Sequence, residues 1–220
     1  MIVNQNRKIR LTTYAESIIG EYQCGFRARR STIDRIFSLR QVIEKYWEYD
    51  KQQTHLFIDF KQAYHSIHRT SMWNIMREFG ILSKLMRIKI YYHFSGEKRP
   101  KTRMHPIPHL FNLVMEKVAR SITASQERVT FNNVRVNCLG YADDIDIIGV
   151  NLRAVENLTT QFKTMACQVW LEIHEGKTKI IEVGRTPQLQ GNVDLAGIRV
   201  ETVESFKYLG TTMSQNAGMT

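Results

Sequence analysis

Two apolar runs that meet at a pair of adjacent carboxylates constrain this chain more than any other feature. Residues 134–139 and 145–150 are rich in β-branched and apolar side chains, and Ala142-Asp143-Asp144 lies between them. This pattern predicts a β-hairpin whose tip carries both acids. Neighbouring carboxylates repel each other, so the pair is costly unless water solvates it or a cation neutralises it. An ordinary polar turn and a site for a hard divalent ion are both compatible with the pattern.

The charge of the chain favours a polyanionic partner. Its 220 residues carry a formal net charge of +10, and the Lys and Arg residues are spread along the sequence rather than gathered in one tail. The alternative is a soluble protein that is merely basic. The length and the 43% hydrophobic content suffice for one domain with a core, or for two closely packed subdomains.

The cysteines and the hydropathy indicate a reducing compartment and no membrane partner. Cys24, Cys138 and Cys167 are far apart in sequence, and neither a Cys-x-x-Cys pair nor a signal-like N-terminus is present. No apolar run approaches the ~20 residues that a helix needs to cross a bilayer. We therefore expect an intracellular protein without a membrane span.

A third candidate acid ends a short apolar run. Residues 54–58 predict a buried strand, and Asp59 follows it directly. Asp at such a junction commonly caps the next helix. If the strand lies beside the Asp-Asp hairpin, however, three carboxylates from two adjacent strands form a two-metal site for phosphoryl transfer, with the ions ~3.5–4 Å apart.

Periodic apolar residues predict helices over much of the remaining chain. Residues 1–20 predict a short helix or an arm, and a further helix follows Ser31, which has capping-box spacing with Asp34. Other helical patterns occupy residues 72–79, 83–92, 110–118 and 155–169. The last third of the chain ends in short strand-like runs.

A loop rich in arginine precedes the helix that Ser31 caps. Arg27, Arg29 and Arg30 either lie on a solvated loop or grip a phosphate, because guanidinium groups and the free amides of a helix N-terminus both favour anions. Further along, His105 and His109 have the spacing of helical metal ligands. Pro106 and Pro108 disfavour a regular helix there, and with it a zinc site.

Six short blocks occur in a fixed order along nearly the whole chain. They are Gln23-x-Gly25-Phe26-Arg27 with Arg30-Ser31-Thr32, then Phe57-Ile58-Asp59-Phe60-Lys61-Gln62-Ala63-Tyr64, Leu110-Phe111-Asn112-Leu113, Tyr141-Ala142-Asp143-Asp144, Lys177-Thr178-Lys179 and Tyr208-Leu209-Gly210. In composition and order they resemble the reverse transcriptase domain of non-LTR (LINE-type) retrotransposons. The ordered set is far more specific than Tyr-Ala-Asp-Asp alone.

The resemblance implies an α+β fold, the fingers and palm of a right-hand polymerase, in which an antiparallel palm sheet packs against helices. Residues 1–53 would be fingers-like, residues 54–190 palm-like, and residues 191–220 would form primer-grip-like strands. No block corresponds to a thumb.

The resemblance also implies the catalytic site. Asp59, Asp143 and Asp144 would be the catalytic acids and would bind Mg²⁺, with Asp59 and Asp143 as the direct ligands. Tyr64, next to Ala63, would lie under the sugar of the incoming nucleotide and exclude a 2′-hydroxyl. Asp146 matches the pattern too, and we interpret it as the outward polar residue of an alternating strand.

Other blocks imply contacts to nucleotide and primer. Arg27 and Arg30 would meet phosphates of the template or nucleotide, and Lys177 or Lys179 would lie near the leaving pyrophosphate. The primer-grip residues would be Phe206, Tyr208, Leu209 and Gly210.

The implied activity is RNA-directed DNA synthesis. A primer 3′-hydroxyl attacks the α-phosphate of a deoxynucleotide, and pyrophosphate leaves. The partners would be an RNA template, a DNA primer and deoxynucleoside triphosphates, and an element of this type acts on nuclear DNA.

Departures from the family pattern predict a truncated and degenerate copy. Residues 93–109 form a shortened loop without the Arg-Gln-Gly core that holds the nucleotide base, and the upstream fingers block is absent. We therefore expect impaired activity. A non-catalytic nucleic-acid-binding remnant is the alternative, and an unrelated two-metal nuclease is disfavoured because it would not require Tyr64 or the block at residues 208–210.

Overall fold

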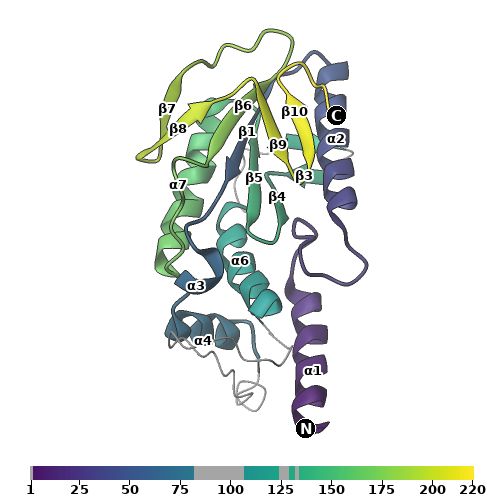
Figure 1. The fold of residues 1–220 in the computed structure, drawn as a ribbon, viewed down its shortest axis with the longest axis vertical. Helices are drawn as coiled ribbons and strands as arrows, with labels where there is room; N and C mark the ends of the chain where they lie inside the picture. The colour runs from purple at the N-terminus through teal and green to yellow at the C-terminus, as the bar shows by residue number, and fades with distance from the viewer. Residues whose placement is uncertain (1, 82–106, 124–128, 132–133) are drawn as a thin grey trace.

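The computed structural model describes residues 2–81, 107–123, 129–131 and 134–220. Within these ranges, the largest sheet has six strands in the order β4-β5-β1-β6-β8-β7 (Figure 1). The strands are β1 (Gln53–Ile58), β4 (Cys138–Tyr141), β5 (Asp144–Gly149), β6 (Lys179–Val183), β7 (Asn192–Leu195) and β8 (Ile198–Thr202). All neighbours pair antiparallel except β6 and β8, which are parallel. This arrangement of sheet and helices confirms the predicted α+β class.

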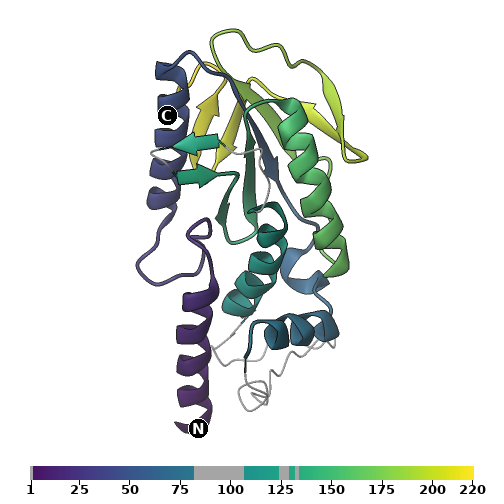
Figure 2. The ribbon, with the colours of Figure 1, turned by 180° about the vertical axis from the view of Figure 1, so that it is seen from behind.

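Helices cover one face of the sheet. They are α6 (Ile107–Thr123) and α7 (Leu152–Gln168), and α7 lies in front of the strands when the molecule is seen from behind (Figure 2). Apolar side chains of β1 and β5 on this face, such as Leu56 and Ile145, pack into one core with Val114 and Phe162. Burial of this apolar surface is the main stabilising contribution to the fold.

A helix and a second hairpin cover the opposite face. They are α2 (Thr32–Glu48) and the pair β9 (Ser205–Tyr208) and β10 (Thr211–Ser214). Phe57 of β1 stacks on Phe206 with ring centroids 4.7 Å apart, and its centroid lies 4.9 Å from that of Tyr208. The sheet is therefore the middle layer of three, which explains why β1 is buried along its whole length.

The remaining described elements are α1 (Ile2–Ile18), α3 (Ala63–Ser66), α4 (Arg69–Glu78), β2 (Val129–Phe131) and β3 (Val134–Val136). The N-terminal segment, predicted as a short helix or an arm, is a helix of 17 residues. The predicted capping box is present, because the Ser31 hydroxyl accepts from Asp34 N and the Asp34 carboxylate accepts from Ser31 N. The predicted helix over residues 83–92, and His105, lie outside the described residues.

The predicted Asp-Asp hairpin is formed by β4 and β5, with a shorter first strand than expected. Residues 134–136 belong to β3, which pairs with β2 instead of β5. The interpretation of Asp146 as an outward-facing residue is wrong. Its side chain is fully buried, because both faces of β5 are covered. Alternation of apolar and polar residues indicates an outward side chain only where one face of the strand is exposed to solvent.

No helix among the described residues is long and apolar enough to span a membrane.

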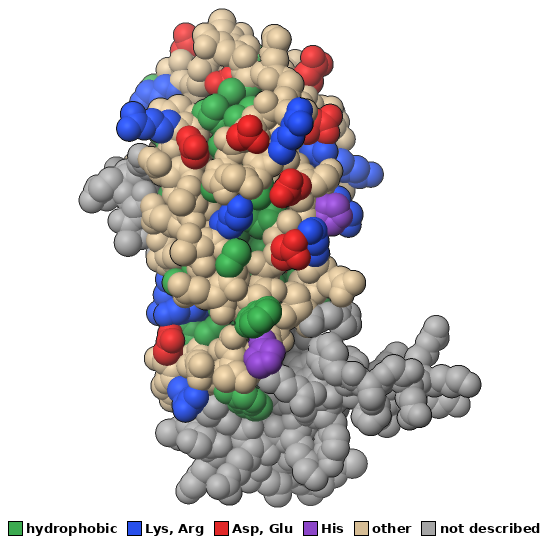
Figure 3. Space-filling view, turned by 90° about the vertical axis from the view of Figure 1, so that its left-hand side faces the viewer, with side chains coloured by type: hydrophobic (Ala, Val, Ile, Leu, Met, Phe, Trp, Pro, Cys, Tyr) green, Lys and Arg blue, Asp and Glu red, His purple; other side chains and the backbone are tan. Residues whose placement is uncertain are grey.

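On the side of the molecule that bears α7, basic and acidic side chains are interspersed (Figure 3). The basic side chains are therefore not gathered into one patch on this face.

We expect Phe57→Ala to lower the free energy of unfolding by about 3–5 kcal/mol, because the substitution leaves a cavity under the β9–β10 hairpin. Chemical denaturation measures this change. The matched control is Phe37→Ala on α2, whose side chain is 61% exposed and whose loss should cost under about 0.5 kcal/mol. Equal losses in the two variants would contradict the proposed layering.

Candidate active site

Three carboxylates gather at one end of two neighbouring strands. Strands β1 and β5 pair antiparallel with Ile58 opposite Ile145. Asp59 directly follows β1 and Asp144 begins β5, so the next step of the same register sets these two residues opposite each other. Asp143 precedes Asp144 in the hairpin turn. The two strand ends therefore deliver all three acids to the same edge.

The gathered charge affects the protonation of Asp144. Burial, together with the negative charges of Asp143 and Asp59, raises the pKa of Asp144 to about 6. A cation at this edge would relieve the repulsion. Carboxylate oxygens are the ligands that hard divalent ions such as Mg²⁺ prefer.

The three acids do not form a closed metal cage in this arrangement. Across the described ranges, no group of three or more His, Cys, Asp or Glu side chains is placed to hold a metal ion. Two of the acids have other partners instead, since Asp143 accepts a hydrogen bond from Tyr64 and Asp59 lies 3.8 Å from the Lys177 ammonium. The donor set fits a divalent ion by its chemistry, because all three side chains are carboxylates.

Tyr64 lies directly beside the acids. Its hydroxyl donates to Asp143 Oδ1 at 3.1 Å. Its ring packs on Phe111 with centroids 4.5 Å apart, and the edge of Phe26 meets it at 6.1 Å. Burial, with the charge of Asp143, raises the pKa of Tyr64 well above its ordinary range, so the phenol stays a donor. Ala63 precedes it, buried at the start of α3.

Of the two candidate lysines, Lys177 is the better placed. Its Nζ lies 3.8 Å from Asp59 Oδ1 and its side chain is 64% exposed, so the ammonium can reach a ligand at the acids. Lys179 instead pairs with Glu201 at 2.6 Å and donates to Gly176 O at 2.9 Å. The geometry favours Lys177 for a phosphate contact.

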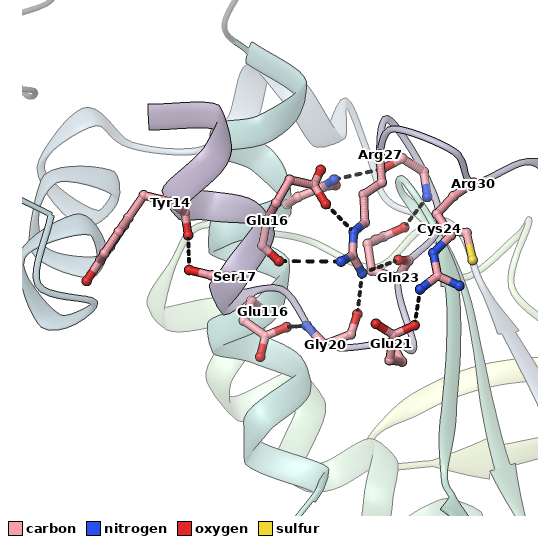
Figure 4. Close-up of polar contacts among 12 residues, drawn as sticks. Tyr14, Glu16, Ser17, Gly20, Glu21, Gln23, Cys24, Arg27, Arg30 and Glu116 are labelled. Atoms are coloured by element: carbon pink, nitrogen blue, oxygen red, sulfur yellow. Dashed lines mark hydrogen bonds and ion pairs between the residues drawn. The ribbon is translucent and has the colours of Figure 1, made fainter. Parts of the chain in front are cut away.

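The two arginines differ in the same way. Arg27 is 7% exposed, pairs with Glu16 at 2.9 Å, and donates to Gly20 O and Gln23 O (Figure 4). Its donors are occupied within the chain, and the phosphate contact suggested by the sequence stays a prediction for Arg27. Arg30 pairs with Glu21 near the surface, where its guanidinium remains accessible.

The β9–β10 hairpin reaches the same edge. Tyr208 is buried, and its hydroxyl donates to the backbone oxygen of Asp144 at 3.3 Å. Leu209 and Gly210 form the tight turn, both with positive φ (49° and 92°). Phe206 stacks on Phe57. All four residues expected in a primer grip therefore lie on one hairpin next to the acids.

A buried pair behind the acids escaped the sequence analysis. His55 Nδ1 and Asp146 Oδ2 are 2.9 Å apart, and both side chains are fully buried. Since Phe57 pairs with Asp146 across the strands, both residues of the pair lie on the same face of the sheet as the acids, with Asp146 one alternation behind Asp144 and His55 two alternations behind Asp59. Burial raises the pKa of Asp146, and the adjacent imidazole opposes this. The sequence did contain a signal for this pair, because His55 and Asp146 are polar residues within otherwise apolar strands.

Both the sequence and the fold are similar to those of reverse transcriptases. The sequence model of the family described as "Reverse transcriptase (RNA-dependent DNA polymerase)" matches residues 2–213. An apo telomerase from Candida tropicalis, truncated from its C-terminal domain, superposes with a TM-score of 0.63 at 10% identity. The superposition covers 98% of this chain and 45% of that chain, and at this identity it establishes the fold alone. A search of curated proteins finds no match.

In metal-free solution, we expect ionised Asp144 to destabilise the fold. The pKa of Asp144 is about 6 in the folded state, against 3.8 for an ordinary carboxyl in the unfolded chain. The folded state therefore holds this proton more tightly, and the stability that this gives below pH 3.8 is lost as the pH rises to about 6. Asp144→Asn removes this loss. The stability of the variant relative to wild type should therefore increase between about pH 4 and about pH 7 in denaturation with EDTA. A constant difference would contradict the coupling.

Proposed function

The chain belongs to the reverse transcriptase family, and from this premise we propose that it is an RNA-directed DNA polymerase domain of the non-LTR retrotransposon type. The observation that carries the proposal is the meeting of Asp59, Asp143 and Asp144 at one sheet edge, beside Tyr64. Membership of the family implies nucleic-acid template and primer, and the use of divalent metal ions. An RNA template, a DNA primer, deoxynucleotides and Mg²⁺ are the specific partners in this proposal.

In the proposed reaction, a primer 3′-hydroxyl attacks the α-phosphate of a deoxynucleotide and pyrophosphate leaves. Asp59 and Asp143 would hold the divalent ions with Asp144 beside them. Bound ions would supply the charge that stabilises the phosphoryl oxygens and the leaving group. The protein contributes mainly by positioning the reactants.

Each neighbouring residue has a defined task in this reaction. The Tyr64 ring lies under the sugar and excludes a 2′-hydroxyl, while its hydroxyl orients Asp143. The exposed Lys177 ammonium meets the leaving pyrophosphate as a charge-assisted donor, and Arg30 remains available for a template or nucleotide phosphate. The β9–β10 hairpin positions the primer end next to Asp144.

We also propose that residues 1–53 are fingers-like, residues 54–190 palm-like, and residues 191–220 primer-grip-like. The segment at residues 93–109, which lacks Arg-Gln-Gly, lies largely outside the described residues. Because that core positions the nucleotide in the family, we propose that polymerase activity is impaired. The chain spans 45% of the telomerase chain that it resembles.

A non-catalytic nucleic-acid-binding remnant is the second candidate, and the net charge of +10 favours it. Such a protein would bind nucleic acid without sequence preference, and its affinity would fall steeply with salt. It differs from the first candidate only in turnover, so primer extension by the wild type distinguishes them.

We expect the purified chain to extend a labelled DNA primer on an RNA template slowly with Mg²⁺ and four deoxynucleotides, and Asp143→Asn to abolish extension. The substitution removes a metal-binding charge and leaves the phosphate contacts, so salt-sensitive binding should persist. Gel-resolved extension and anisotropy measure the two properties. No extension by a folded, nucleic-acid-binding wild type would favour the remnant, and fast, sustained extension would refute the impairment.

Where the wild type extends a primer, we expect Tyr64→Val to raise ribonucleotide incorporation relative to deoxynucleotide incorporation by about tenfold or more, because the ring that excludes the 2′-hydroxyl is lost. Single-nucleotide extension kinetics measure this ratio. Tyr64→Phe is the matched control, since it keeps the ring and loses only the hydrogen bond to Asp143. Unchanged discrimination in Tyr64→Val would remove Tyr64 from the nucleotide site.

A further inference from the structure

A buried glutamine far away in sequence holds the tip of the Asp-Asp hairpin. The Gln23 side chain is fully buried. Its Nε2 donates to Ala142 O at 2.9 Å, and its Oε1 accepts from Ala142 N at 2.7 Å. One side chain therefore satisfies both backbone groups of the residue that immediately precedes Asp143.

The residue held in this way has an unfavourable backbone conformation. Ala142 has a φ of 60°, in the left-handed region, and it is 4% exposed. For a residue with a Cβ, this conformation costs about 1–2 kcal/mol, and it persists only where the surroundings enforce it. Without Gln23, the buried N–H and C=O of Ala142 would lose these partners, which adds a further cost.

The loop that carries Gln23 approaches the hairpin very closely. A Cβ on Gly25 would lie 2.0 Å from Ala142 N and 2.6 Å from Ala142 Cα, so only glycine fits between loop and turn. Gly25 N also donates to Gln23 Oε1 at 2.8 Å, which fixes the orientation of the amide.

The loop is itself anchored from two sides. Asn112 of α6, fully buried, donates from Nδ2 to Gly25 O at 2.7 Å. Cys24 N donates to Gly140 O at 2.9 Å, and Gly140 N donates to Tyr22 O at 2.7 Å, so the loop extends alongside β4. Figure 4 shows Arg27 beside Gln23, and its guanidinium donates to Gly20 O and Gln23 O.

We propose that Gln23, Gly25 and Asn112 form a clamp that fixes the turn before Asp143 and thereby positions its carboxylate toward a divalent ion. The inference rests on the proposed function, because it concerns the same acids. Gln23 touches no reacting atom in this scheme, so it is a positioning residue. Its effect is on metal affinity, since groups that orient metal ligands typically change that affinity about 10–100-fold when they are replaced.

The test compares Gln23→Met, which keeps the length of the side chain and loses all its hydrogen bonds, with the wild type. Gln161→Met, on the exposed face of α7, is the matched control. Titration calorimetry with Mg²⁺ alone measures affinity, and primer extension gives the Mg²⁺ concentration for half-maximal rate. We expect Gln23→Met to weaken Mg²⁺ binding about tenfold or more and the control to leave it unchanged.

A second variant separates positioning from loss of the fold. Gln23→Glu keeps an acceptor for the two amides, and burial favours its protonated carboxyl, whose O–H can donate to Ala142 O, so it should fold and weaken Mg²⁺ binding less than Gln23→Met. Equal Mg²⁺ affinity in both variants and the wild type would overturn the clamp. Weakened affinity in variants of a wild type that never extends a primer would support the clamp and refute the proposed polymerase. No Mg²⁺ binding by the folded wild type would refute both.

Discussion

The antiparallel pairing of β1 with β5 is the interaction on which the rest of the structure depends. Its register sets Asp59 opposite Asp144, and a slip by one residue would turn each side chain to the other face of the sheet. Both faces enforce the register. Ile58 and Ile145 pack into the core under α6 and α7, while Phe57 packs under the β9–β10 hairpin. The burial of these apolar side chains offsets the repulsion that accumulates among the acids.

Local patterns sufficed to predict the elements that local forces determine. The capping box of α2, the apolar strand before Asp59 and the hairpin with two acids at its tip all follow from short-range rules, and the matching family supports the fold assigned from the ordered blocks. The errors came from long-range contacts. Asp146 was expected to face water because nothing in its own strand reveals the layer that covers it. The local pattern also could not reveal the ion pair of Arg27 with Glu16, which lies on another element, and the phosphate contact of Arg27 stays a prediction.

Buried polar groups near the hairpin form a second organising layer behind the acids. His55 and Asp146 pair in a site without solvent, and Gln23 and Asn112 bind backbone groups that would otherwise lack partners. Such groups contribute little net stability where apolar residues of similar shape would pack well. Their contribution is geometric, because each of these hydrogen bonds is compatible with one backbone arrangement and disfavours similar alternative arrangements. Sequence patterns do not reveal which of these residues bond to one another, since the partners are up to 119 residues apart.

Tyr64 connects the two tasks that the proposed polymerase must perform. Phe111 and Phe26 fix its ring, and its hydroxyl is bound to Asp143, which the Gln23 clamp fixes from the other side through Ala142. The orientation of Asp143 is therefore determined jointly by a ring that would select the sugar and by a turn that would present the metal ligand. Residues that share a partner in this way are energetically coupled. Substitutions of Tyr64 and Gln23 should consequently combine non-additively.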